Sequence, residues 1–202
     1  MKIIVTCDDM NPSVIPIWKQ TWDKIKEAHP WLKITVFTVP LWKGRSDNDI
    51  FKNKEFKQWH KERKGWVEIA QQGYSGDYPP ECLRFKKPQQ ALIRRGYRKI
   101  TTYLPDDFYS FKAPFYRMDH NTIEILQDLG FSACVQHGRL ILLNMMNKPM
   151  EEFIMIESHI NIEEKNPDNI QLIHQKMDKY LSELEKKYQY VTIGELLKGG
   201  ME

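Results

Sequence analysis

The chain has 202 residues, of which 41% are hydrophobic and 28% are charged. This length suits one compact domain, and the hydrophobic content excludes the disordered class of protein. The formal charge of +3 arises from 30 basic and 27 acidic residues, so it favours neither a nucleic-acid partner nor a membrane. We therefore expect a single domain over residues 1–202.

Cysteine content and the N-terminus bear on the compartment. Cys7, Cys82 and Cys134 stand far apart in the sequence, and three cysteines without a CxxC pair do not suggest a disulfide framework. The N-terminus has only a four-residue apolar run, which is too short for a signal peptide or a membrane span. Both features predict a cytoplasmic protein. They leave the oligomeric state unknown.

Short β-branched runs alternate with helical patterns along the chain. In chain order we expect a strand at 3–6, a helix at 12–27, a strand at 33–39, a short helix within 44–58, a strand at 66–70, a helix within 79–95, strands at 99–104 and 132–136 with a helix at 122–129 between them, a strand at 153–157, a helix at 167–188, a strand at 190–193 and a short helix at 195–198. Gly130 is expected to close the helix at 122–129. This alternation predicts an α/β fold with a parallel sheet or barrel covered by helices.

Two adjacent aspartates, Asp8 and Asp9, follow the first predicted strand. In parallel α/β folds, sites are built at this end of the strands. One interpretation is structural, with the pair capping the helix that begins near Pro12. The other is functional, because adjacent like charges at a buried strand end are costly without a partner.

Four segments resemble, in order, the polysaccharide deacetylase (NodB homology) family. They are residues 6–9 (TCDD), 68–77 (EIAQQGYSGD), 111–117 (FKAPFYR) and 154–160 (IMIESHI). Residues 190–196 are similar to the closing strand and helix of that family. The resemblance covers almost the whole chain and implies an irregular (β/α) barrel. It also implies hydrolysis of an acyl group on an amino sugar with the help of a bound metal.

The resemblance assigns catalytic roles to three residues. The first aspartate of the family pair is a general base and the second binds the metal, and these positions are Asp8 and Asp9 here. The histidine at the end of the late strand is thought to be the general acid, and this position is His159. Asp8 and His159 are therefore the candidate catalytic residues.

The third segment implies the substrate-binding residues. The resemblance places Lys112, Pro114, Tyr116 and Arg117 in the wall of the substrate site. Lys112 stands where the family usually has arginine, so the charge is kept and the planar fork is lost. Arg117 could take over that role.

The metal positions depart from the family. Its two histidine ligands, four residues apart, correspond to Gln72 and Gly76. An amide oxygen is a weak ligand and glycine offers none, so of the metal ligands only Asp9 remains. Asp77 could join Asp8 and Asp9 in an oxygen-only site for magnesium or calcium, or it could be a turn residue before two prolines. We expect no cofactor or a weakly held divalent metal.

Three hypotheses follow for function. An altered or weakly active hydrolase would keep Asp8 as base and His159 as acid. A pseudoenzyme, favoured by the loss of both histidines, would bind a glycan, a nucleotide-like anion or a protein partner at the same site. In the third, the resemblance is accidental and the chain is an unrelated α/β protein. The expected ligand is a carbohydrate or another small anion, and the basic run at 84–99 is either a docking patch for it or a solvated helix face.

Overall fold

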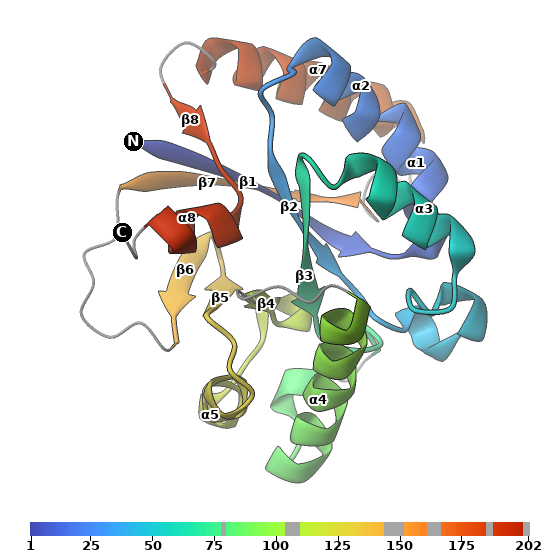
Figure 1. The fold of residues 1–202 in the computed structure, drawn as a ribbon, viewed down its shortest axis with the longest axis vertical. Coiled ribbons are helices and arrows are strands. Elements are labelled where there is room, and N and C mark those ends of the chain that lie inside the picture. Colours follow the sequence, from blue (N-terminus) through green and yellow to red (C-terminus); the bar gives the residue numbers. More distant parts are fainter. Residues whose placement is uncertain (78–79, 104–109, 144–151, 161–166, 185–187, 200–202) are drawn as a thin grey trace.

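One mixed sheet organises the chain. The computed structural model describes residues 1–77, 80–103, 110–143, 152–160, 167–184 and 188–199 (Figure 1). Its strands are β1 (Lys2–Met10), β2 (Ile34–Thr38), β3 (Val67–Gln72), β4 (Ser110–Lys112), β5 (Ala133–Gln136), β6 (Arg139–Leu142), β7 (Phe153–His159) and β8 (Gln189–Tyr190). The pairing order is β6-β5-β4-β3-β2-β1-β7, with β6 antiparallel to β5 and the other neighbours parallel. The short β8 pairs with the start of β1.

Helices cover the outside of this sheet, except the last one, which lies across one end of it (Figure 1). They are α1 (Ile15–Gln20), α2 (Trp22–Ala28), α3 (Lys54–Arg63), α4 (Lys86–Tyr103), α5 (His120–Asp128), α7 (Pro167–Leu184) and α8 (Ile193–Gly199). None of the helices in the described part of the chain combines the length and the apolar character that crossing a bilayer requires.

The sheet curls until it is nearly a closed barrel. One apolar cluster takes side chains from every strand of the pairing order except β4, and from α8 and the residues before it: Ile4, Phe37, Ala70, Ala133, Val135, Leu140, Leu142, Phe153, Met155, Val191, Ile193, Leu196 and Leu197. Since β6 and β7, the two ends of the order, both contribute to it, this cluster is the interior of the barrel. The irregular (β/α) barrel predicted from the sequence is confirmed.

Tryptophans form the packing between the barrel and its outer helices. Trp18 stacks on Trp22 with ring centroids 5.7 Å apart, and it meets Trp59 edge-on at 5.1 Å. All three side chains are almost fully buried beside β1 and β2. Aromatic pairs of this kind stabilise a core beyond the area they bury.

The strand predicted at 99–104 is wrong, because the described part of this segment is the last turn of α4. The residues that α4 buries are Gln89, Ile93, Gly96 and Ile100, which lie on one helical face. At Gly96 an added Cβ would lie 2.2 Å from the amide nitrogen of Gln71. Close packing of this face on β3 therefore outweighs the strand preference of the β-branched residues.

Other boundaries also differ from the prediction. The helix expected at 12–27 is divided at Thr21, whose hydroxyl donates to the carbonyl of Ile17. Strand β6 was not predicted, and in the segment 190–193 only Tyr190 belongs to a strand, while Ile193 begins α8. The helix expected at 122–129 is confirmed as α5, with Gly130 in a left-handed conformation after it.

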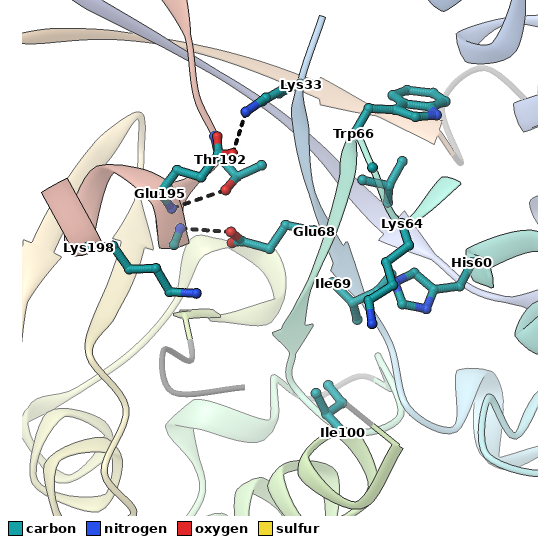
Figure 2. Close-up of a pocket in the computed structure, with 13 residues that line it drawn as sticks. Lys33, His60, Lys64, Trp66, Glu68, Ile69, Ile100, Thr192, Glu195 and Lys198 are labelled. Carbon is teal, nitrogen blue, oxygen red and sulfur yellow. Dashed lines mark hydrogen bonds and ion pairs between the residues drawn. The ribbon is translucent and has the colours of Figure 1, made fainter. Parts of the chain in front are cut away.

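The N-terminal end of the barrel holds α8 in place. A pocket of about 250 Å³ lies there, between α3, β3 and α8 (Figure 2). In it the Glu68 carboxylate accepts a hydrogen bond from the Gly194 N–H at 2.7 Å and another from the Thr35 hydroxyl at 3.3 Å. A Cβ at position 194 would lie 2.6 Å from Glu68 Oε2. Lys33 pairs with Glu195 of the same helix. The charged groups of this pocket therefore fasten α8 across the end of the barrel.

We expect Glu68→Ala to lower the free energy of unfolding by about 1–3 kcal/mol, because it leaves the buried Gly194 N–H without its acceptor. Urea denaturation measures this difference. Glu183→Ala, on an exposed position of α7, is the control and should stay within about 0.5 kcal/mol of the wild type. Equal stability of the Glu68 variant and the wild type would contradict this account of α8.

Candidate active site

Four strand ends bring the candidate residues together. Alternate residues of a strand share a face, so Asp8 lies on the interior side of β1, with Ile4. In the register of the parallel pairs, Asp8 of β1 is opposite His159 of β7, and Gln72 of β3 is opposite Lys112 of β4. The carboxyl ends of these strands thus place an acid, a histidine, an amide and a lysine at one end of the barrel.

A buried lysine is the centre of this site. The side chain of Lys112 is 1% exposed, and its ammonium lies 2.6 Å from Asp8 Oδ2. The same ammonium pairs with Glu157. It also lies 4.7 Å from the centre of the Tyr116 ring, within the range of a cation–π contact. One cation therefore balances two carboxylates inside the barrel.

Asp8 and His159 perturb each other. Burial raises the pKa of Asp8 to about 6, although the positive charges of Lys112 and His159 oppose the rise. His159 Nδ1 lies 3.3 Å from Asp8 Oδ2 and 3.7 Å from Asp9 Oδ2. The contact with Asp9, with the charge of Asp8, raises the pKa of His159 against the effect of burial. Proton-exchanging groups are thus in direct contact at the predicted catalytic positions.

Tyr116 closes over this pair. Its hydroxyl lies 2.5 Å from His159 Nε2 and 3.4 Å from Asp8 Oδ2. Its ring stacks on His137, with centroids 4.9 Å apart and an angle of 15° between the planes. Burial, and then the charge of Asp8, raise the pKa of Tyr116 above its usual range, so the group stays a phenol.

At the first metal position, Gln72 is hydrogen-bonded to the aspartate that should bind the metal. The Asp9 N–H donates to Gln72 Oε1 at 2.7 Å, and Gln72 Nε2 donates to Asp9 Oδ1 at 2.8 Å. Asp9 has φ +64°, a left-handed conformation that is uncommon outside glycine. The amide thus binds Asp9 with both its oxygen and its nitrogen, where a histidine nitrogen would face a metal.

At the second metal position, an indole fills the space beside Gly76. A Cβ added there would lie 2.6 Å from Cζ3 of Trp42. Glu81 holds this loop in place and is fully buried. Its carboxylate accepts hydrogen bonds of 2.6–2.9 Å from the backbone N–H groups of Tyr74, Ser75 and Gly76 and from the Ser75 hydroxyl. The contacts of Trp42 and Glu81 with this loop were not predicted from the sequence. Neither belongs to a motif, and only the fold brings them to this loop.

Two predicted site residues are exposed. Asp77 is one of them, and no group of three or more His, Cys, Asp or Glu side chains in the described residues could hold a metal ion. Asp77 therefore does not join Asp8 and Asp9 in such a group. Arg117 is exposed as well, and Lys112 itself makes the contact with Asp8. Pro114 is buried against the 73–76 loop, where a Cβ at Gly73 would lie 2.4 Å from its ring.

The donor set therefore does not fit the metal that the resemblance implies. Gln72 uses its oxygen and nitrogen on Asp9, and the place of a side chain at position 76 is filled by Trp42. A catalytic metal site needs about three protein ligands and an open position. The capping interpretation of Asp8 and Asp9 also fails, because Asn11 caps the next helical turn by accepting from the Ser13 N–H at 3.0 Å.

The raised pKa of Asp8 predicts a pH dependence of stability. The folded chain binds a proton at Asp8 more readily than the unfolded chain does, so this contribution to stability falls as pH rises from 4 to 6. At about 1.4 kcal/mol per pH unit, a rise from the ordinary value of 3.8 to about 6 corresponds to roughly 3 kcal/mol. His159 acts in the same direction. Its raised pKa stabilises the folded chain at pH values below the unfolded pKa of 6.5, and this stabilisation is lost as pH rises through the folded pKa.

The free energy of unfolding of the wild type should therefore fall relative to that of Asp8→Asn as pH rises from 4 to 7. Denaturant titrations at several pH values measure it. Asp47→Asn, on an exposed loop residue paired with Arg45, is the control, and its effect should be much smaller. A difference independent of pH would contradict the raised pKa of Asp8.

This chain is similar to known proteins in its structure, but no match is found by sequence. No family model matches the chain, and no curated protein matches it by sequence. A CE4 domain of a multidomain xylanase from the hindgut metagenome of Trinervitermes trinervoides superposes with a TM-score of 0.65 and 15% identity, over 98% of this chain and 90% of that one. It is similar in fold along nearly its whole length.

A CE4 family pseudoenzyme from Bacillus anthracis is also similar, with a TM-score of 0.61 and 13% identity over 97% of this chain and 65% of that one. A mutant of that pseudoenzyme, described as having restored enzymatic activity, superposes with a TM-score of 0.65 and 14% identity, over 97% and 67% of the two chains. At these identities the likeness shows the fold. The resemblance predicted from the sequence is confirmed to that extent: the chain has the fold of the CE4 polysaccharide deacetylases, a fold shared by enzymes and pseudoenzymes.

Proposed function

We propose that this protein is a degenerate relative of the polysaccharide deacetylases that binds carbohydrate at the C-terminal end of the barrel without metal-dependent deacetylation. The observation that carries the proposal is the pair of hydrogen bonds between Gln72 and Asp9. The Gln72 amide occupies Oδ1 of Asp9, so a metal would meet only Oδ2, which lies 3.7 Å from His159 Nδ1. Beyond that oxygen the site would offer only a neutral amide oxygen and no ligand from position 76.

The remaining groups suit a neutral, hydroxyl-rich ligand. The carboxylates of Asp8 and Asp9 and the ring of His159 provide acceptors and donors within one small area. Phe115, 52% exposed next to them, offers an apolar face. Sugars are bound by this combination of hydrogen-bonding groups and aromatic rings.

A second candidate function is an altered hydrolase, and the contact between Asp8 and His159 favours it. A carboxylate and an imidazole 3.3 Å apart could act as general base and general acid. The buried Lys112 would then hold Asp8 in place. Without a Lewis acid, the carbonyl polarisation that a metal supplies is missing, so we expect such activity to be slow.

Carbohydrate binding is tested by NMR titration with N-acetylglucosamine oligomers and acetylated xylo-oligosaccharides. We expect saturable shifts at Asp9, Phe115 and Tyr116, and at least a tenfold loss of affinity in His159→Ala. Glu183→Gln, which changes an exposed carboxylate of the outer helix α7, should bind as the wild type does. Shifts spread over other surfaces, or none with either sugar series, would exclude a carbohydrate site here.

Rebuilding the metal site tests the loss of the parent chemistry. The wild type should hold no stoichiometric zinc by elemental analysis and release no acetate from these sugars above a buffer blank. The variant Gln72→His/Gly76→His should also bind no stoichiometric zinc, because Trp42 lies where the side chain of the histidine at position 76 must go. Adding Trp42→Ala should allow zinc to bind, at a cost in folding stability because position 76 has φ +68°.

The double variant is thus the matched control for the triple variant. Stoichiometric zinc in the wild type would contradict the proposal directly. Zinc bound equally well by the double and the triple variants would show that Trp42 is no obstacle. Acetate release by the wild type that Asp8→Asn abolishes would establish the altered hydrolase instead.

A further inference from the structure

The backbone that carries Tyr116 is strained. Phe115 and Tyr116 are consecutive and have φ +58° and +56°, in the left-handed region that favours glycine. Side chains larger than glycine enter this region at a cost in free energy, and such residues gather at binding sites and catalytic sites. The contacts of the Tyr116 side chain must offset that cost.

Those contacts resemble the contacts of a bound ligand. The ring lies between the His137 ring on one side and the Lys112 ammonium on another. The hydroxyl reaches His159 Nε2 and Asp8 Oδ2, the two predicted catalytic groups. A flat six-membered ring with a hydroxyl group is thus held by stacking, by a cation and by two hydrogen-bonding partners.

This arrangement leaves the functional groups engaged with one another. His159 meets carboxylates at Nδ1 and the phenol at Nε2. Asp8 meets Lys112, His159 and Tyr116. An external hydroxyl group can hydrogen-bond to His159 Nε2 only by displacing the phenol, because a ring nitrogen makes one hydrogen bond in the ring plane.

We propose that the side chain of Tyr116 is an internal ligand of this site, which occupies a subsite for a ring-borne hydroxyl group and leaves it when an external ligand binds. This inference rests on the proposed carbohydrate site, in which the displacing group is a sugar hydroxyl. The internal ligand competes with the external one, so it lowers the apparent affinity of the site.

The test replaces the internal ligand by an external copy. p-Cresol reproduces the tyrosine side chain from Cβ outward, and Tyr116→Gly removes that side chain at a position whose φ suits glycine. We expect Tyr116→Gly to bind p-cresol at one site with a millimolar Kd in an NMR titration, and the wild type not to bind it. Toluene, which lacks the hydroxyl, should bind at least tenfold more weakly, and so should p-cresol to Tyr116→Gly/His159→Ala.

Tyr180→Ala is the matched control, because it removes an exposed tyrosine of α7 and should create no p-cresol site. Folded Tyr116→Gly that binds p-cresol no better than this control would overturn the inference. If Tyr116→Gly does not fold, Tyr116→Phe replaces it. The nitrogen NMR shift of His159 Nε2 should then change through loss of the phenol contact, and an unchanged shift overturns the inference as well.

The two proposals can fail separately. Binding of p-cresol to Tyr116→Gly together with no carbohydrate binding by any variant would leave Tyr116 as an internal ligand and exclude the carbohydrate function. Carbohydrate binding that Tyr116→Phe leaves unchanged, with no p-cresol site in Tyr116→Gly, would keep the carbohydrate site and remove Tyr116 from it.

Discussion

A lysine ammonium inside the barrel balances the charges on which the site depends. Lys112 is almost without contact with water, and the carboxylates of Asp8 and Glu157 both meet its nitrogen. Removing one partner of a buried ion pair typically costs about 3–5 kcal/mol, because the other charge is left unpaired. With this cation in place, Asp8 can lie buried beside His159, and the ring of Tyr116 can cover both. The orientations of Asp8, Glu157 and Tyr116 thus depend on where Lys112 is anchored on β4.

Three side chains occupy the space in which a metal-dependent site would be open. Gln72 binds Asp9, Trp42 fills the space beside Gly76, and Tyr116 meets His159. These contacts come from different strands and loops. Gln72 and Tyr116 occupy groups that the metal or the substrate would otherwise contact, and Trp42 occupies space. The polar groups of the site are therefore hydrogen-bonded to one another. Such an arrangement is consistent with a retained binding role more than with decay of the site into a loosely packed surface.

Much of this organisation could be predicted from the sequence, because it depends on short segments and on their order along the chain. The aspartates after the first strand, the late histidine and the missing metal histidines all occur in such segments. Their order resembles that of the polysaccharide deacetylases, and this resemblance implies a barrel. The strand predicted near Ile100 failed, because β-branched residues there pack as one face of α4 on β3. Trp42 and Glu81 could not be found, since their roles are contacts with a distant loop. The Tyr116 side chain points toward Asp8 and His159 because Phe115 and Tyr116 have positive φ angles. No residue pattern in FKAPFYR predicts these angles.

We propose that the amide of Gln72 takes the place of a metal as the partner of Asp9. The most direct measurement follows the side-chain amide signal of Gln72 by NMR while zinc is added in excess over the protein. We expect one pair of NH2 proton signals from a hydrogen-bonded amide, whose positions and widths stay the same throughout the titration. Loss or a saturable shift of that signal at one equivalent of zinc would mean that Asp9 releases the amide for a metal, and it would contradict the account.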